Sequence, residues 1–205
     1  MTPAIPRTPS RLLLRLLAGI FAAVLLTGCM TAPPLDAAQR PGKWAASLAV
    51  NGLENLHKVD DNLYRSRQPG EAGMQAAREQ LGIRTVVNLR AFHSDRKLAE
   101  QAGVNSVDLG LVAWDIDDEE VVAVLRTLRQ REQGPFLLHC QHGADRTGVM
   151  TAMYRIIEQG WTREEALDEM LHGGFGFHTI WFNIVDYLEH VDIERIRAQL
   201  DAPLP

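Results

Sequence analysis

The stretch Phe136-Leu-Leu-His-Cys-Gln-His-Gly-Ala-Asp-Arg-Thr-Gly148 decides both the fold and the chemistry of this chain. The apolar run from Pro135 to Cys140 predicts a buried central β-strand. A helical pattern follows, from Arg146 to Gln159, and Gly160 ends it. The loop between them therefore lies at a helix N-terminus, where free backbone N–H groups bind anions.

The residue types in this loop favour a phosphate group as the anion. Gly143 permits backbone angles that a bulkier residue resists. The planar guanidinium of Arg146 can hold two phosphate oxygens at once. The same positive surroundings favour the thiolate form of Cys140, which then lies at the floor of a phosphate cradle. The residues predicted to bind the substrate phosphate are Gln141, His142, Gly143, Ala144, Asp145 and Arg146.

The order His-Cys, five residues, Arg-Thr resembles the motif of the cysteine-dependent protein tyrosine phosphatases. The chain is most similar to the compact dual-specificity branch, and to exported bacterial members in particular. These also share Leu63-Tyr-Arg-Ser66 with Pro69, and Gly-Gly-Phe-Gly over residues 173–176. The resemblance covers roughly residues 55–190. It implies Cys140 as the nucleophile, a phosphocysteine intermediate, and no metal or other cofactor.

The resemblance also implies a general acid, because an alkoxide or phenoxide leaves slowly unless it is protonated. In the family this acid is an aspartate on a loop before a helix and upstream of the cysteine. We assign it to Asp115, which follows Trp114 and leaves the next two aspartates free to cap a helix. Asp117 or Asp118, and then Asp108, are the alternatives. The purely structural interpretation is that all of these aspartates form a solvated acidic cluster that caps the helix.

Two further residues are predicted to support the site, His139 by orienting the loop and Thr147 by hydrogen bonding the sulfur of Cys140. His139, Cys140 and His142 together suggest a metal site. Adjacent residues of a strand point to opposite faces, however, and the sequence shows no second cluster of ligands. The sequence therefore predicts no metal.

The patterns along the rest of the chain predict strands that alternate with helices. We expect a hairpin over 55–66, further strands at 85–90, 107–112 and 135–140, and helices at 71–81, 95–102, 117–132, 146–159, from 162 onward, and 179–200. This alternation indicates an α/β fold with a mainly parallel central sheet flanked by helices, like the dual-specificity phosphatases.

The N-terminus has the features of a bacterial lipoprotein signal. An apolar run from Leu16 to Leu26 follows three arginines, and it is too short to span a bilayer. Leu26-Thr-Gly-Cys29 resembles a lipobox, in which the chain is cut before the cysteine and that cysteine is acylated. An ordinary signal peptide with a chance cysteine is the alternative. The predicted organisation is a signal peptide at 1–28, a tether at 29–44 and a phosphatase domain at 45–205.

Charge and cysteine content limit the partners of the mature chain. The leader removes three of the 21 basic residues, which leaves 18 against 26 acidic ones and a formal net charge of −8. Such an acidic surface argues against nucleic acid and anionic lipid as partners, so membrane attachment is expected through the lipid alone. Met30 after Cys29 favours the periplasmic face of the outer membrane. Cys140 is then a lone thiol in an oxidising compartment.

The expected function is a lipid-anchored protein phosphatase. No extra segment is present to build a deep phosphotyrosine slot, so we expect action on phosphotyrosine and also on phosphoserine or phosphothreonine. The alternatives are an inositol-phosphate or other small-molecule phosphatase, a catalytically weak phosphopeptide-binding lipoprotein, and a rhodanese-type sulfurtransferase. Relatives that act on inositol phosphates tend to carry lysine in the cradle loop, and this chain has none there.

Overall fold

The computed structural model describes residues 31–203 of the 205-residue chain. The strands are β1 (Ala46–Ser47), β2 (His57–Lys58), β3 (Leu63–Arg67), β4 (Thr85–Asn88), β5 (Asn105–Asp108) and β6 (Phe136–Cys140). The helices are α2 (Glu71–Leu81), α3 (Arg96–Ala102), α4 (Asp118–Arg129), a 3₁₀ turn η1 (Arg131–Gln133), α5 (Asp145–Gln159), α6 (Arg163–His172), α7 (Phe182–His190) and α8 (Ile193–Asp201). No helix within residues 31–203 is long and apolar enough to cross a membrane.

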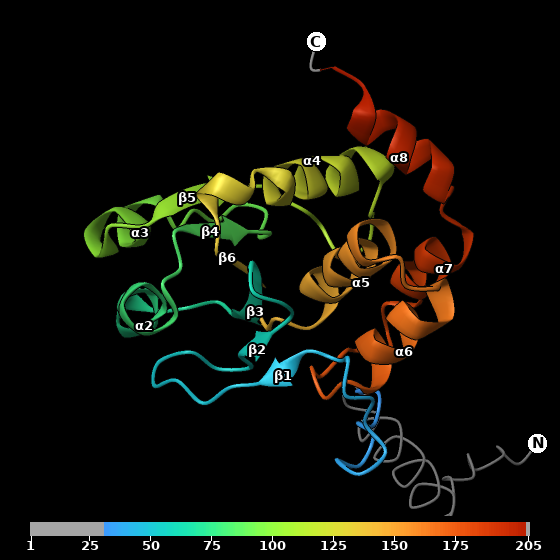
Figure 1. Ribbon diagram of the computed structural model, residues 1–205, viewed down its shortest axis with the longest axis horizontal. Coiled ribbons are helices and arrows are strands. Elements are labelled where there is room, and N and C mark those ends of the chain that lie inside the picture. The colour runs from blue at the N-terminus through green and yellow to red at the C-terminus, as the bar shows by residue number, and fades with distance from the viewer. Residues whose placement is uncertain (1–30, 204–205) are drawn as a thin grey trace, which may run out of the picture. The chain divides into compact units, whose positions relative to one another are not determined.

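The six strands form one sheet in the order β1-β2-β3-β6-β4-β5 (Figure 1). β3, β6, β4 and β5 pair in parallel, and β1 and β2 extend the sheet in an antiparallel hairpin arrangement. The predicted α/β class with a mainly parallel sheet is therefore confirmed, as is the hairpin between β2 and β3. β6 occupies the centre, where both of its neighbours run parallel to it.

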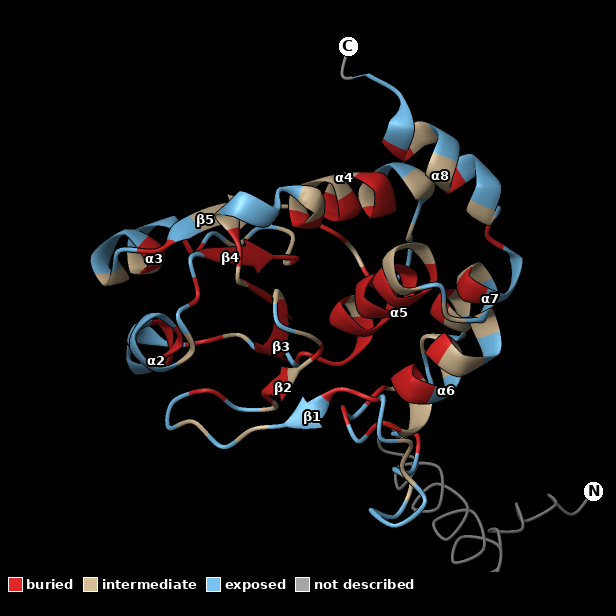
Figure 2. Cartoon of the chain, viewed as in Figure 1, coloured by how far each residue is buried: buried red, intermediate tan, exposed pale blue. Residues whose placement is uncertain are grey.

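Side chains alternate between the two faces of the sheet and so build two cores. Phe136 and Leu138 pack with α4 to α8, whereas Leu137 packs with α2 and α3 on the opposite face. Figure 2 shows β3, β4 and most of α5 in the colour of buried residues, and all five residues of β6 are buried as well. The continuous apolar run that predicted β6 is explained by this burial on both faces.

The parallel strands all end at the same edge of the sheet. Arg67 is in register with Cys140, and Asn88 is in register with His139. The segments that leave β3, β4, β5 and β6 therefore emerge together, which is where ligands bind in open α/β sheets.

Two predicted elements are wrong in their extent. The helix expected over 179–200 is two helices, because Asp192 adopts an extended conformation and begins α8 by accepting a hydrogen bond from the Arg195 N–H at 3.0 Å. The strand expected at 107–112 is β5, which ends at Asp108. Beyond β5 the chain turns sharply, with the Leu111 N–H donating to the Leu109 carbonyl at 2.8 Å.

The segment 31–44 is not a free tether, contrary to the expectation for 29–44. The Ala32 N–H donates to the Phe177 carbonyl at 3.0 Å. Trp44, at the other end of the segment, is only 5% exposed. The prediction was wrong because the proline-rich composition of this segment carries no information about the surface it packs on. Cys29 and the predicted signal peptide lie outside the described residues.

Candidate active site

Cys140 lies where the central strand meets the loop that leads into α5. Its side chain is buried, with 1% of the residue exposed, and its thiol is free. α5 begins at Asp145, so Arg146 lies in its first turn. The structure thus confirms the predicted arrangement of a cysteine at a strand end and an arginine at the following helix start.

The loop after Cys140 is held from its outer side by two side chains. Arg65 of β3 donates to the Gly143 carbonyl at 2.7 Å and to the Ala144 carbonyl at 3.5 Å. Asn55 donates to the His142 carbonyl at 3.0 Å. Across a trans peptide the C=O and the next N–H point in opposite directions. The N–H groups of residues 143–145 therefore point away from Arg65 and Asn55, which leaves them free to cradle an anion.

Arg65 is a charged group inside the protein. It is 1% exposed, and its guanidinium stacks 3.8 Å from the centre of the Phe175 ring. Burial lowers its pKa to about 10, while Glu169 and Cys140 act in the opposite direction. Arg65 is therefore still protonated at neutral pH and contributes a fixed positive charge close to Cys140.

Gly143 is required by the close approach of the loop to β3. Its φ of +70° lies in the left-handed region, where residues with a side chain are strained. A Cβ at this position would come within 2.4 Å of the Ser66 carbonyl oxygen and 2.6 Å of the Arg67 nitrogen. The predicted need for glycine is thus explained by two separate constraints.

Two polar side-chain atoms in the first turn of α5 are buried without a partner. The Nε of Arg146 and the Oγ1 of Thr147 make no hydrogen bond with any described residue. Nη1 of Arg146 donates to the Leu111 carbonyl at 3.1 Å and lies 3.5 Å from the Leu89 carbonyl. Because buried polar atoms are nearly always paired in native proteins, these two are candidates to contact a ligand.

His139 connects the cradle to the opposite core through a chain of polar side chains. Its Nε2 lies 2.7 Å from Oδ2 of Asp95, and both side chains are fully buried. The other carboxylate oxygen of Asp95 lies 3.1 Å from Nε2 of His93. Burial acts to raise the pKa of Asp95, but the hydrogen bonds from His139 and His93 outweigh it and lower the pKa. Asp95 therefore stays ionised and orients the ring of His139.

The acidic residues on the loop before α4 have different environments. Asp117 caps α4 by accepting from the Glu120 N–H at 2.8 Å. Asp118 accepts a hydrogen bond from the Tyr187 hydroxyl at 2.9 Å. Asp115 is exposed, and its carboxylate makes no hydrogen bond or ion pair within residues 31–203. Of these three, Asp115 alone is free to act on a ligand.

Asp108, the remaining alternative, is occupied at the end of β5. It accepts hydrogen bonds from Ser94 at 2.6 Å and from Asn88 at 3.0 Å. Burial raises its pKa, but these hydrogen bonds outweigh it and the pKa is lowered. Asp108 therefore remains ionised and is a poor proton donor.

The loop that carries Asp115 is joined to the cradle and to α7. Arg146 holds the Leu111 carbonyl, and the Asn183 side chain donates to the Ala113 carbonyl at 2.8 Å. The structure thus brings Cys140, Arg146 and the Asp115 loop to one edge of the sheet. Gln141 is exposed on the cradle loop and His142 is exposed beside it. The Asp145 carboxylate turns away to accept a hydrogen bond from the His178 N–H at 2.9 Å, so its predicted contact with phosphate is limited to its backbone.

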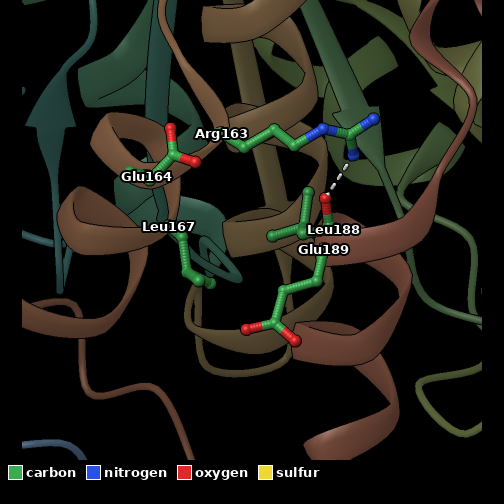
Figure 3. Close-up of a pocket in the computed structure, with 5 residues that line it drawn as sticks. All are labelled: Arg163, Glu164, Leu167, Leu188 and Glu189. Atoms are coloured by element: carbon green, nitrogen blue, oxygen red, sulfur yellow. Dashed lines mark hydrogen bonds between the residues drawn. The ribbon is translucent and has the colours of Figure 1, made fainter.

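A small cavity elsewhere on the surface carries none of this chemistry. It lies between α6 and α7 and has a volume of about 140 Å³ (Figure 3). Arg163, which lines it, donates to the Leu188 carbonyl at 2.7 Å and so caps the end of α7. The other lining residues are Glu164, Leu167 and Glu189. This cavity is explained by the packing of the two helices.

Comparison with known proteins identifies the family. The family model described as "DSP-PTPase phosphatase fused to NAD+ Kinase" matches residues 43–181. The dual specificity protein phosphatase TpbA of Pseudomonas aeruginosa is 39% identical over 195 residues, which is 95% of this chain and 87% of TpbA. The chain belongs to the dual-specificity phosphatase family of cysteine-dependent phosphatases. This dual-specificity phosphatase is thus an enzyme that hydrolyses phosphoric monoesters in a phosphorylated substrate.

Solved structures agree with this membership. A crystal structure of P. aeruginosa TpbA matches with a TM-score of 0.72 at 36% identity, over 80% of this chain and all of that one. TpbA has also been solved in complex with phosphotyrosine. The catalytic core of the PP-IP phosphatase Siw14 from Saccharomyces cerevisiae matches over 73% of this chain and 93% of that one, with a TM-score of 0.64 at 21% identity, and so shares the fold.

Sequence reasoning did not assign roles to three residues that build the site. Arg65 was quoted only as part of a motif, Asp95 only as the start of a helix, and Asn55 only as part of a strand. Arg65 stands in the middle of a predicted strand, and this is the one signal that pointed to a buried polar role. Nothing in the sequence links Asp95 to His139, because their contact depends on how the start of α3 packs against the sheet.

Proposed function

We propose that this phosphatase hydrolyses phosphotyrosine, and also phosphoserine or phosphothreonine, in proteins through a phosphocysteine intermediate. The proposal rests on the buried Cys140 at the end of β6 and on two unpartnered polar atoms in the first turn of α5, Nε of Arg146 and Oγ1 of Thr147. A phosphate above the sulfur provides acceptors for the Arg146 fork and for the N–H groups of residues 143–145. Thr147 donates to the sulfur when the sulfur becomes the leaving group.

The reaction follows in two balanced steps. The thiolate of Cys140 attacks phosphorus, the P–O bond to the substrate breaks, and the leaving oxygen takes the proton of Asp115. A water molecule then attacks the phosphocysteine and gives a proton to Asp115 as the S–P bond breaks. Inorganic phosphate leaves, and the thiolate is regenerated. No metal or redox cofactor takes part in either step.

A protein substrate is favoured by the apolar side chains around the site. The large hydrophobic residues that are exposed within residues 31–203 are Phe92, Trp114, Ile180 and Phe182. Phe92 and Trp114 lie on the two loops that Arg146 contacts, and Phe182 precedes Asn183, which holds the Asp115 loop. Apolar groups exposed on the loops that border a phosphate site suit the flanking residues of a phosphopeptide better than a small polyphosphate.

The test of the mechanism is Cys140→Ser. This variant is expected to lose turnover and to retain phosphotyrosine-peptide binding, because the cradle does not depend on the sulfur. Vanadate is expected to inhibit the wild-type enzyme. Turnover that persists in Cys140→Ser refutes the assignment of the nucleophile.

The test of the substrate class compares a phosphopeptide with p-nitrophenyl phosphate and inositol phosphates. Phe92→Ala and Phe182→Ala are expected to raise KM for the phosphopeptide and to leave p-nitrophenyl phosphate hydrolysis unchanged. An equal loss on both substrates contradicts the rim hypothesis. Preferred hydrolysis of inositol phosphates supports the small-molecule alternative instead.

We further propose that Cys29 is acylated and anchors the enzyme at the periplasmic face of the outer membrane. The basic and apolar leader followed by Leu-Thr-Gly-Cys supports this proposal. Met30 alone separates Cys29 from Thr31, which pairs with His178 in an isolated β-bridge. Cell fractionation tests it: Cys29→Ser is expected to move the protein from the membrane to the soluble fraction. Membrane association equal to that of the wild type refutes the anchor.

A further inference from the structure

Three potential metal ligands meet at the rim of the cradle. His142, Asp145 and His178 each offer one ligand atom, and these three atoms all lie within 4.8 Å of one another. His142 and Asp145 come from the cradle loop and the start of α5, whereas His178 comes from the segment between α6 and α7. The sequence prediction of no metal considered His139, Cys140 and His142. The fold brings together a different set, whose third member is distant in the sequence.

We propose that His142, Asp145 and His178 form a binding site for a divalent transition-metal cation, with Zn²⁺ as the preferred ion. Two imidazoles and one carboxylate are a ligand set that Zn²⁺ uses in proteins. Ligands of one Zn²⁺ lie about 2.0–2.2 Å from it, so in a tetrahedral site two of them are about 3.3–3.6 Å apart. The three atoms, which all lie within 4.8 Å of one another, therefore need to converge by up to about 1.5 Å. The fourth position is left open to solvent.

The two segments that supply the ligands are held in place without the ion. Asn55 donates to the His142 carbonyl at 3.0 Å and to the Phe175 carbonyl at 2.9 Å, so one side chain joins the cradle loop to the segment before His178. The Ala32 N–H adds a hydrogen bond to the residue before His178. Because the backbones are already placed, binding requires side-chain rotation and little ordering of the chain.

The contact between Asp145 and His178 marks where the ion would enter. Nδ1 of His178 lies 2.9 Å from Oδ2 of Asp145, and the Asp145 side chain is 9% exposed. The ion would replace this contact and be coordinated by both atoms. The hydrogen bond from the His178 N–H to Asp145 is made by the backbone, so it holds the carboxylate during the exchange.

The charges around the site act in both directions. The Asp145 carboxylate attracts a cation, whereas Arg67 and Arg146 repel it. The two imidazoles bind a metal in their neutral form, and Asp145 supplies the negative charge of the site.

The experiment measures Zn²⁺ binding directly, by isothermal titration of the full chain carrying Cys140→Ser. This background removes the thiolate, which is itself a zinc ligand. We expect one Zn²⁺ per chain. His178→Gln is expected to weaken the binding at least about 10-fold, since even the loss of a supporting outer-shell group costs 10–100-fold.

His190→Gln is the matched control. Nδ1 of His190 lies 3.3 Å from Oδ1 of Asp186 on the surface of α7, so it forms a similar histidine–aspartate pair outside the cluster. It is expected to leave the affinity unchanged. Thermal unfolding without metal checks that both variants are folded, and added Zn²⁺ is expected to raise the Tm of His190→Gln more than that of His178→Gln.

Two outcomes overturn the proposal. One is no Zn²⁺ binding in the Cys140→Ser background, whether or not the wild type binds Zn²⁺ through Cys140, and the other is binding that His178→Gln does not weaken. Since none of these measurements uses phosphatase turnover, failure of the metal site is distinguishable from failure of the proposed function.

Discussion

Replacing Arg65 by methionine is expected to damage both stability and catalysis. The substitution keeps the length and the apolar stem of the side chain. It removes the charged hydrogen bond to the Gly143 carbonyl and the stacking on Phe175. A hydrogen bond to a charged group contributes about 1.5–3 kcal/mol, and a desolvated cation–π contact about 2 kcal/mol. Part of this is offset because the guanidinium no longer has to be buried. We expect a net loss of about 2–4 kcal/mol in the free energy of unfolding.

The catalytic effect follows from the position of the loop. Without Arg65 the carbonyls of residues 143 and 144 lose their partner, and the N–H groups of the cradle lose their orientation. A displacement of about 1 Å at a reacting centre can cost about 100-fold in rate, so we expect a fall in kcat of that order. Arg65→Lys keeps the charge but lacks the planar fork, so its kcat is expected to lie between those of Arg65→Met and the wild type.

The assays are urea unfolding followed by circular dichroism, and steady-state turnover of p-nitrophenyl phosphate. Arg67→Met is the control on the same strand, because Arg67 forms an exposed ion pair with Glu54. Exposed pairs contribute about 0–1 kcal/mol, so this variant is expected to unfold almost as the wild type does. If Arg65→Met unfolds at the wild-type urea concentration and keeps the wild-type kcat, the role given to Arg65 is refuted.

Three further predictions concern other groups. Asp115→Asn is expected to lower kcat by about 10²–10⁴, most for a phosphothreonine peptide and least for p-nitrophenyl phosphate. Asp117→Asn is the control and is expected to lose only about 0.5–2 kcal/mol of helix-cap stability. A leaving-group effect in Asp117→Asn and none in Asp115→Asn contradicts the assignment. Burial and the Asp117 carboxylate raise the pKa of Glu120 from 4.5 to about 7. Between pH 4.5 and pH 7 the folded state therefore holds a proton that the unfolded state has lost, so the free energy of unfolding falls as pH rises through this range. Glu120→Gln is expected to remove this pH dependence of the free energy of unfolding, and to raise that free energy by about 1 kcal/mol at pH 8 after allowance for solvent screening. A pH dependence equal to that of the wild type contradicts this. Mild peroxide is expected to inactivate the enzyme by oxidising Cys140, reversibly with an added thiol, and an intact mass without an adduct counts against it.

The sequence predicted the parts of the site that are local in the chain. Cys140 at the strand end, Arg146 at the helix start and the glycine between them are set by one short stretch, in which the hydrophobic period changes from strand to helix. The helix expected from residue 162 onward was predicted for the same reason, and in the structure it begins with a capping box formed by Thr162 and Glu165. Each of these features is decided by residues within a few positions of one another.

Features that depend on packing were not predictable in the same way. Arg65 reaches the cradle because β3 lies next to β6, and this pairing joins residues more than 70 positions apart. The segment 31–44 looked like a linker because its prolines prevent regular structure, yet backbone groups within it pair with the turn around residue 177. The cluster of His142, Asp145 and His178 was not predicted, because His178 lies 33 positions after Asp145 in the chain and only the fold brings it to the cradle.

One guanidinium links the reacting centre to both loops around it. Nη1 of Arg146 contacts the carbonyls of Leu89 and Leu111, while its buried Nε has no partner among the described residues. A bidentate phosphate takes Nε–H together with one terminal N–H, so Nη1 can keep its contacts with the loops while the fork binds the anion. We expect bound phosphate to order the guanidinium and, through the Leu111 carbonyl, the loop that carries Asp115. Under the proposed mechanism Asp115 is the general acid, so the substrate itself would order this loop at the moment of proton transfer.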